Sequence, residues 1–187
     1  MVEISLDCWE RYEHLPPLGK LLFLKVLHIT GWHAVKYIGN EFHGDGAISF
    51  PSLKEFTLHK MRDLEEWRTM NGRENFPCQS TLDITDCPKL VEIPIIPSIT
   101  DLTMCRSNVM LIRSVMNLTS LSSLVIEDMD DELTVLPDGL LQNHNMLKIL
   151  KIFNMPNLNS LTNQLDNLSA LNEFRIECCD KIESLPE

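Results

Sequence analysis

The residues of this chain that could carry chemistry are its cysteines, its histidines and one Gly-Lys pair. The six cysteines form no C-x-x-C pair and no Cys/His zinc spacing, and the six histidines show no H-E-x-x-H pattern. Gly19-Lys20 is followed by leucine, so it lacks the hydroxyl residue of a phosphate-binding loop. The adjacent Cys178-Cys179 suits redox chemistry, but Cys179 also occupies a repeated structural position. The sequence therefore predicts no enzyme and no catalytic, cofactor or metal site.

A periodic pattern of apolar residues, apolar-x-x-apolar-x-apolar, organises the rest of the chain. It occurs eight times, and successive occurrences begin 23, 29, 26, 20, 22, 26 and 24 residues apart. A period of this length is typical of leucine-rich repeats. The occurrences are Met1/Ile4/Leu6, Leu24/Leu27/Ile29, Leu53/Phe56/Leu58, Gln79/Leu82/Ile84, Ile99/Leu102/Met104, Leu121/Leu124/Ile126, Leu147/Leu150/Ile152 and Leu171/Phe174/Ile176.

Each occurrence predicts a short strand, because its apolar residues alternate with variable ones; Leu124 and Ile126, for example, alternate with Val125 and Glu127. A further buried position is expected three residues after each strand, and Cys87 and Cys179 both fall there, which favours packing in a reducing compartment over disulfides. One such coil cannot bury its own apolar edge, whereas a stack of coils can. We therefore expect an α/β solenoid: an arc of leucine-rich repeats with a parallel β-sheet on its concave side and a mostly irregular or short-helical convex side.

Residues 1–187 are expected to form a single leucine-rich-repeat domain of about eight repeats. Neither end shows a polar capping unit, so we expect the chain to be a section of a longer protein. Three glycines in residues 39–50 predict a loop, while residues 139–147 and 163–171 suit brief helices. Gln79 interrupts its apolar column, which predicts a strained or partly open coil around it.

The charge balance excludes several classes of partner. The formal net charge is -11 and the pI is about 4.9, with no basic patch of the kind that nucleic-acid binding needs. An acidic run at 127–132 is either a solvated surface or a docking patch for a basic partner. No apolar stretch is long enough to span a membrane, and the N-terminus lacks the basic and apolar regions of a signal peptide.

The variable strand residues form columns on the exposed face of the predicted sheet. Phe153 is expected to point outward between Lys151 and Arg175, and aromatic and Arg residues are enriched at binding hot spots. The alternative is a solvated sheet face with one exposed Phe, which is ordinary for a soluble protein. The candidate partner-binding residues are His28, Thr57, His59, Asp83, Thr103, Val125, Glu127, Lys151, Phe153, Arg175 and Glu177.

Five segments carry a more specific signal: LPPLGKLLFLKVLHITGWHAVKYIGNEF (15–42), FPSLKEFTLHKMRDLEEW (50–67), FPCQSTLDITDCPKL (76–90), LPDGLLQNHNMLKILKI (136–152) and IECCDKIESLPE (176–187). In this order they resemble the leucine-rich-repeat region of plant nucleotide-binding leucine-rich-repeat (NLR) disease resistance proteins of the coiled-coil class. The chain departs from that family's usual residues at Trp9, Tyr12, Leu22, Gln79 and Asn145-Met146.

The resemblance implies a cytoplasmic role in plant defence. In such receptors the repeat region senses a pathogen effector, directly or through a guarded host protein, and packs on the nucleotide-binding module to hold it inactive. That module is absent from this chain, so the resemblance implies no nucleotide or other cofactor here. Two alternatives remain: an extracellular receptor domain, suggested only by the sequons at Asn117 and Asn167, and a generic leucine-rich-repeat interaction scaffold such as a ubiquitin-ligase substrate adaptor.

Overall fold

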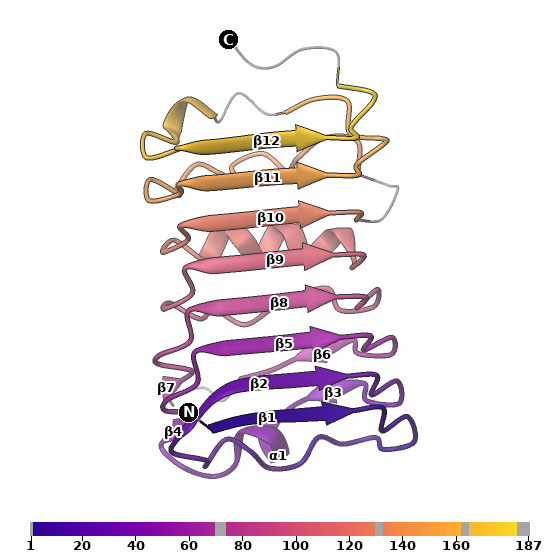
Figure 1. Cartoon of the computed structure of the whole chain (residues 1–187), viewed down its shortest axis with the longest axis vertical. Coiled ribbons are helices and arrows are strands. Elements are labelled where there is room, and N and C mark those ends of the chain that lie inside the picture. Colours follow the sequence, from indigo (N-terminus) through magenta and orange to yellow (C-terminus); the bar gives the residue numbers. More distant parts are fainter. Residues whose placement is uncertain (1, 70–73, 130–132, 162–164, 183–187) are drawn as a thin grey trace.

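The computed structural model describes residues 2–69, 74–129, 133–161 and 165–182, which form a stack of coils along one parallel sheet (Figure 1). The eight strands of this sheet pair side by side in the order β1-β2-β5-β8-β9-β10-β11-β12, and every pair is parallel. The expected leucine-rich-repeat solenoid is thereby confirmed. The strands are β1 (Val2–Asp7), β2 (Leu24–Thr30), β5 (Glu55–His59), β8 (Thr81–Thr85), β9 (Asp101–Cys105), β10 (Ser123–Glu127), β11 (Ile149–Phe153) and β12 (Glu173–Glu177).

The apolar pattern sets the register of this sheet. Leu124 lies opposite Leu102 on one side and Leu150 on the other, and the same alignment holds for the second apolar residue of every occurrence. Leu27, Leu124 and Leu150 are completely buried, as predicted. Burial of each such side chain contributes about 1.5–3 kcal/mol, so the continuous row is the main source of stability. Met1 lies outside the described residues.

Every strand of the main sheet ends in the same backbone turn. The residue after each strand has φ between 44° and 71°, and its N–H donates to the carbonyl of the last residue of the next strand at 2.8–3.1 Å in the seven coils that have a following strand. A left-handed backbone costs a non-glycine residue about 1–2 kcal/mol, which the repeated hydrogen bond offsets. These residues are Cys8, Gly31, Lys60, Asp86, Arg106, Asp128, Asn154 and Cys178.

The position that follows this turn holds the predicted buried column. Trp32, Met61, Cys87, Ser107, Met129 and Met155 are all buried there. Trp9 and Cys179, in the first and last coils, are more exposed, although Trp9 stacks on Trp32 with ring centroids 5.3 Å apart. The column supports the interpretation of Cys87 as a packing residue, and burial raises the pKa of its thiol to about 12.

The side opposite the sheet is mostly irregular. It carries two short pairings, β3 (Tyr37–Ile38) with β6 (Glu66–Trp67) and β4 (Ile48–Ser49) with β7 (Glu74–Asn75). Its helical segments are α1 (Asn40–His43) and two 3₁₀ helices, η1 (Val109–Asn117) and η2 (Leu165–Asn167). Figure 1 places η1 behind β9 and β10.

Two local expectations were inaccurate, and a third, the brief helix within 163–171, is confirmed in part. The expected loop at 39–50 contains α1 and β4, which pack closely on the turn at Gly19: a Cβ there would lie 2.0 Å from the carbonyl oxygen of His43. Residues 139–147 form turns instead of a helix, and the nine-residue η1 was not predicted. In the region 163–171, η2 is the helical part, while 163 and 164 lie outside the described residues.

The coil around Gln79, which was expected to be strained or partly open, is not open. Gln79 is completely buried, and β8 pairs normally on both sides. Its Nε2 donates one long hydrogen bond of 3.5 Å to the Thr81 carbonyl, and its Oε1 has no hydrogen-bond partner. The coil closes because the flanking apolar contacts outweigh one poorly paired amide.

Replacing Gln79 by leucine should therefore stabilise the protein. The equivalent residues of the neighbouring coils, Leu53 and Ile99, are completely buried apolar side chains. We expect Gln79→Leu to raise the free energy of unfolding by about 1–3 kcal/mol, because an unpaired buried acceptor disappears. Urea denaturation measures the change, with Leu53→Ala as a control that should lose about 2–5 kcal/mol. A Gln79→Leu protein less stable than the native one would contradict this assignment.

Candidate functional site

The outward-facing side chains of the main sheet lie in three columns, one residue of each column per strand. The eleven candidate partner-binding residues predicted from the sequence all lie in two of these columns, the central one and the one at the carboxyl ends of the strands. Nine are half-buried, and Arg175 and Glu177 are exposed. The structure thus brings these residues onto one face, while their contact with a partner stays a prediction.

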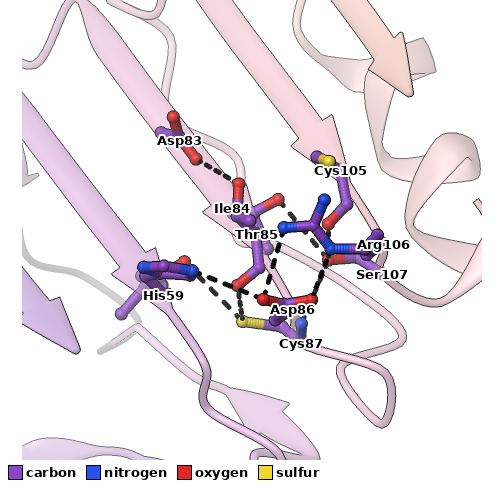
Figure 2. Close-up of polar contacts among 10 residues, drawn as sticks. His59, Asp83, Ile84, Thr85, Asp86, Cys87, Cys105, Arg106 and Ser107 are labelled. Carbon is purple, nitrogen blue, oxygen red and sulfur yellow. Dashed lines mark hydrogen bonds and ion pairs between the residues drawn. The ribbon is translucent and has the colours of Figure 1, made fainter. Parts of the chain in front are cut away.

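At β5, β8 and β9 this face carries a polar network centred on Asp86 (Figure 2). The Asp86 carboxylate accepts hydrogen bonds from Arg106 Nε at 2.7 Å and Nη2 at 3.4 Å, and His59 Nε2 lies 3.3 Å from it. The bond from Arg106 lowers the pKa of Asp86 below its ordinary value. The three groups come from three successive coils, so the network ties coil to coil at the rim of the sheet.

Beneath this network, Ser107 satisfies backbone groups that a larger apolar residue would leave unpaired (Figure 2). Its hydroxyl accepts from the Cys87 N–H at 3.2 Å and donates to the Cys105 carbonyl at 2.9 Å. Burial raises the pKa of the neighbouring Cys105 thiol to about 11, so this thiol stays protonated at neutral pH. Ser107 and Cys105 thus serve packing and backbone hydrogen bonding.

Toward the first strands the outward face stays polar. His28 Nδ1 forms a 3.0 Å hydrogen bond with Thr57 Oγ1, and its Nε2 lies 3.8 Å from Glu3. Asp83 accepts from the Thr85 hydroxyl at 2.8 Å. Most outward side chains from β1 to β9 are polar, and few could serve as apolar anchors for a partner.

The outward face has a different character on β10, β11 and β12. Lys151 Nζ lies 3.2 Å and Arg175 Nε 2.7 Å from the same carboxylate oxygen of Glu173. Beside these charges, Val125, Ile149 and Phe153 expose half-buried apolar side chains. An apolar centre with a charged rim is the usual anatomy of a protein-binding surface. We call these six residues the β10–β12 patch: Val125, Ile149, Lys151, Phe153, Glu173 and Arg175.

Sequence reasoning missed two members of this patch. Ile149 and Glu173 belong to the outward column at the amino ends of the strands, two residues before Lys151 and Arg175. The alternation along each strand that predicts the other two outward columns predicts this column as well. The sequence does not show that one carboxylate, that of Glu173, lies against two cations.

The described residues contain no group of three or more His, Cys, Asp or Glu placed to hold a metal ion. None of the helices among them is long and apolar enough to cross a membrane. Gly19-Lys20 lies in a turn, where Lys20 pairs with Asp45 and Gly19 allows the close approach of α1.

The Asp86 network generates a titration prediction. Arg106→Ala should raise the pKa of Asp86 toward its ordinary value, since the bond that favours the charged carboxylate is removed. Carboxyl-carbon NMR titration measures this pKa. Because the folded-state pKa lies below the unfolded one, the contribution of Asp86 to stability is present above the unfolded pKa and is lost as the pH falls through the folded one.

A matched control exists on the same rim. The hydrogen bond from Lys89, 2.5 Å long, lowers the pKa of Asp63 in the same way. Lys89→Ala should therefore raise the pKa of Asp63 and leave that of Asp86 unchanged. If Arg106→Ala leaves the titration of Asp86 where it was, the network is not the cause of the shift.

The chain is similar in sequence to plant proteins. It is 34% identical over 166 residues to the disease resistance protein RGA1 of Solanum bulbocastanum, a match that covers 88% of this chain and 16% of that protein. It is 28% identical over 191 residues to the disease resistance RPP13-like protein 1 of Arabidopsis thaliana, covering 92% of this chain and 18% of that protein. The chain thus spans less than a fifth of either relative. No protein-family model matches it.

Among solved structures, the leucine-rich-repeat domain of the type III effector XopL has a similar fold. It superimposes with a TM-score of 0.63 over 98% of this chain and 63% of that domain's chain. The sequences are 14% identical, so the likeness concerns the fold alone.

Proposed function

This chain is a leucine-rich-repeat domain related in sequence to plant disease resistance proteins, and we propose that it binds proteins through the outward face of its sheet as part of a cytoplasmic immune receptor. The partners would be a pathogen effector, or a host protein that the receptor guards. The same domain would also pack on the nucleotide-binding module of its parent receptor and hold that module inactive. In this role the chain needs no nucleotide or metal of its own.

The observation that carries the proposal is the β10–β12 patch. Apolar side chains cluster there beside a lysine and an arginine, on a sheet in which β10 and β11 are paired on both sides and β12 on one. Aromatic and Arg residues with a charged surround are the usual anchors of protein interfaces. A stack of coils offers such a face without any rearrangement of its own, so little conformational entropy is lost on binding.

A substrate adaptor and an enzyme receive less support as alternative functions. A ubiquitin-ligase substrate adaptor would use the same kind of face, but the relatives found are named as disease resistance proteins. A catalytic role would need reactive side chains brought together, whereas Cys87 and Cys105 are buried with raised pKa values and His59 is held against Asp86. A non-enzymatic interaction domain fits both the fold and the relatives.

The test is a charge reversal in the full-length receptor that carries this domain. Lys151→Glu with Arg175→Glu should abolish the effector-dependent response, or trigger the response without effector, because two rim cations of the patch become anions. Cell death and reporter induction in leaf tissue measure both outcomes.

The control changes the net charge equally at another place. Lys25 and Lys54 are exposed at the amino edge of β2 and β5, so Lys25→Glu with Lys54→Glu should leave the response as it is in the native receptor. If the receptor with the Lys151/Arg175 double substitution still responds to its effector and remains inactive without it, the patch has no role in recognition or inhibition.

A further inference from the structure

We propose that the β10–β12 patch binds an acidic segment of its protein partner, in which a carboxylate lies next to an apolar side chain. This inference rests on the proposed function and specifies the chemistry of the partner. The carboxylate would meet Lys151 and Arg175, and the apolar side chain would lie on Phe153 and its neighbours.

The distribution of charge over the outward face favours this partner. Lys151 and Arg175 are the only Lys or Arg residues in the three outward columns. From β1 to β9 the same columns instead carry five carboxylates: Glu3, Asp7, Glu55, Asp83 and Asp101. On β10 to β12 these columns carry Glu127, Glu173 and Glu177 as well, but only there do they also offer a lysine and an arginine, which favours docking of an acidic segment at Lys151 and Arg175.

The geometry of the two cations leaves room for a second carboxylate. Lys151 Nζ and Arg175 Nε share one oxygen of Glu173, so a single negative charge serves two positive ones. The Arg175 side chain is still 57% exposed. Guanidinium groups can bind carboxylates through two parallel hydrogen bonds, and the contact of Arg175 with Glu173 is made by Nε at 2.7 Å. A partner carboxylate can therefore approach from solvent without breaking the existing pair.

The apolar part of the patch lies within reach of the same cations. Ile149, Lys151 and Phe153 alternate along β11 and face outward together, and Val125 lies opposite Lys151 on β10. All three apolar side chains are half-buried, so each has surface left to cover. Burying that surface under a leucine or similar side chain adds about 25 cal/mol for each Å² removed from water. A purely acidic segment would leave this gain unused.

A basic segment is the competing partner. It would be attracted to the carboxylates of β1 to β9, and to Glu127 and Glu177 beside the patch. Those carboxylates are spread over many strands and lie among short polar side chains, so attraction there is diffuse and strongly screened by salt. The apolar anchors of β10 and β11 lie beside the cations of β11 and β12, and the two kinds of side chain come together only in this patch.

The test uses the full chain and three fluorescent peptides of equal length. All three alternate leucine with a second residue, which is glutamate, glutamine or lysine. We expect the glutamate peptide to bind about ten-fold more tightly than the glutamine peptide at low salt, which corresponds to about 1.4 kcal/mol. Lys151→Gln with Arg175→Gln should remove this difference, whereas Lys25→Gln with Lys54→Gln should leave it unchanged. Fluorescence anisotropy measures the affinities.

A single substitution separates this proposal from simple attraction to a charged surface. Glu173→Gln removes the carboxylate that competes for Lys151 and Arg175, so the glutamate peptide should bind about three-fold more tightly, in line with one unit charge at close range in water. The lysine peptide should not bind more weakly to the Lys151/Arg175 variant, because neither cation attracts it.

Three results would overturn the proposal: no binding of the glutamate peptide, binding that survives in the Lys151/Arg175 variant, or weaker binding after Glu173→Gln. The charge reversal in the full-length receptor distinguishes failure of the acidic-segment proposal from failure of the proposed protein-binding function. If the charge reversal changes the receptor's response while the glutamate peptide does not bind, the face recognises a partner of other chemistry. If the charge reversal leaves the receptor's response unchanged and the glutamate peptide does not bind, the β10–β12 patch does not bind a protein partner.

Discussion

The stacking of each coil's apolar edge on the next is the constraint on which this structure depends. Leucines such as Leu124 and Leu150 are buried only because a neighbouring coil covers them, so no repeat is stable alone. The left-handed turn after each strand serves the same end, since its N–H bonds to the next strand and keeps the coils in register. Once this register is fixed, the outward columns are fixed with it, and the face acquires its pattern of charge.

Much of the fold could be predicted because the apolar residues that recur along the sequence are the residues that are buried. The strands, their parallel order and the buried column after each strand all follow from that period. The features that could not be predicted depend on contacts between coils. Gln79 is held in a closed coil by apolar neighbours that its own segment does not reveal, and η1 forms where Asn108 caps its first turn by accepting from the Met110 N–H.

The candidate site was predictable in position but not in detail. Residues such as Lys151, Phe153 and Arg175 were placed on one face by counting along the repeat, and the structure puts them there. Counting could not show that Arg106 and His59 are engaged by Asp86, or that Glu173 joins the two cations of the patch. Such pairing depends on side-chain conformations across neighbouring coils, and it determines which charges remain available to a partner.

The most direct measurement compares two adjacent residues of β10 by urea denaturation. Leu124 is completely buried in the stack and Val125 is half-buried on the outward face. Leu124→Ala should lower the free energy of unfolding by about 2–5 kcal/mol, while Val125→Ala should lower it by less than about 1 kcal/mol. An equal loss in both variants, or a larger loss for Val125→Ala, would contradict the stacked solenoid and the outward face built on it.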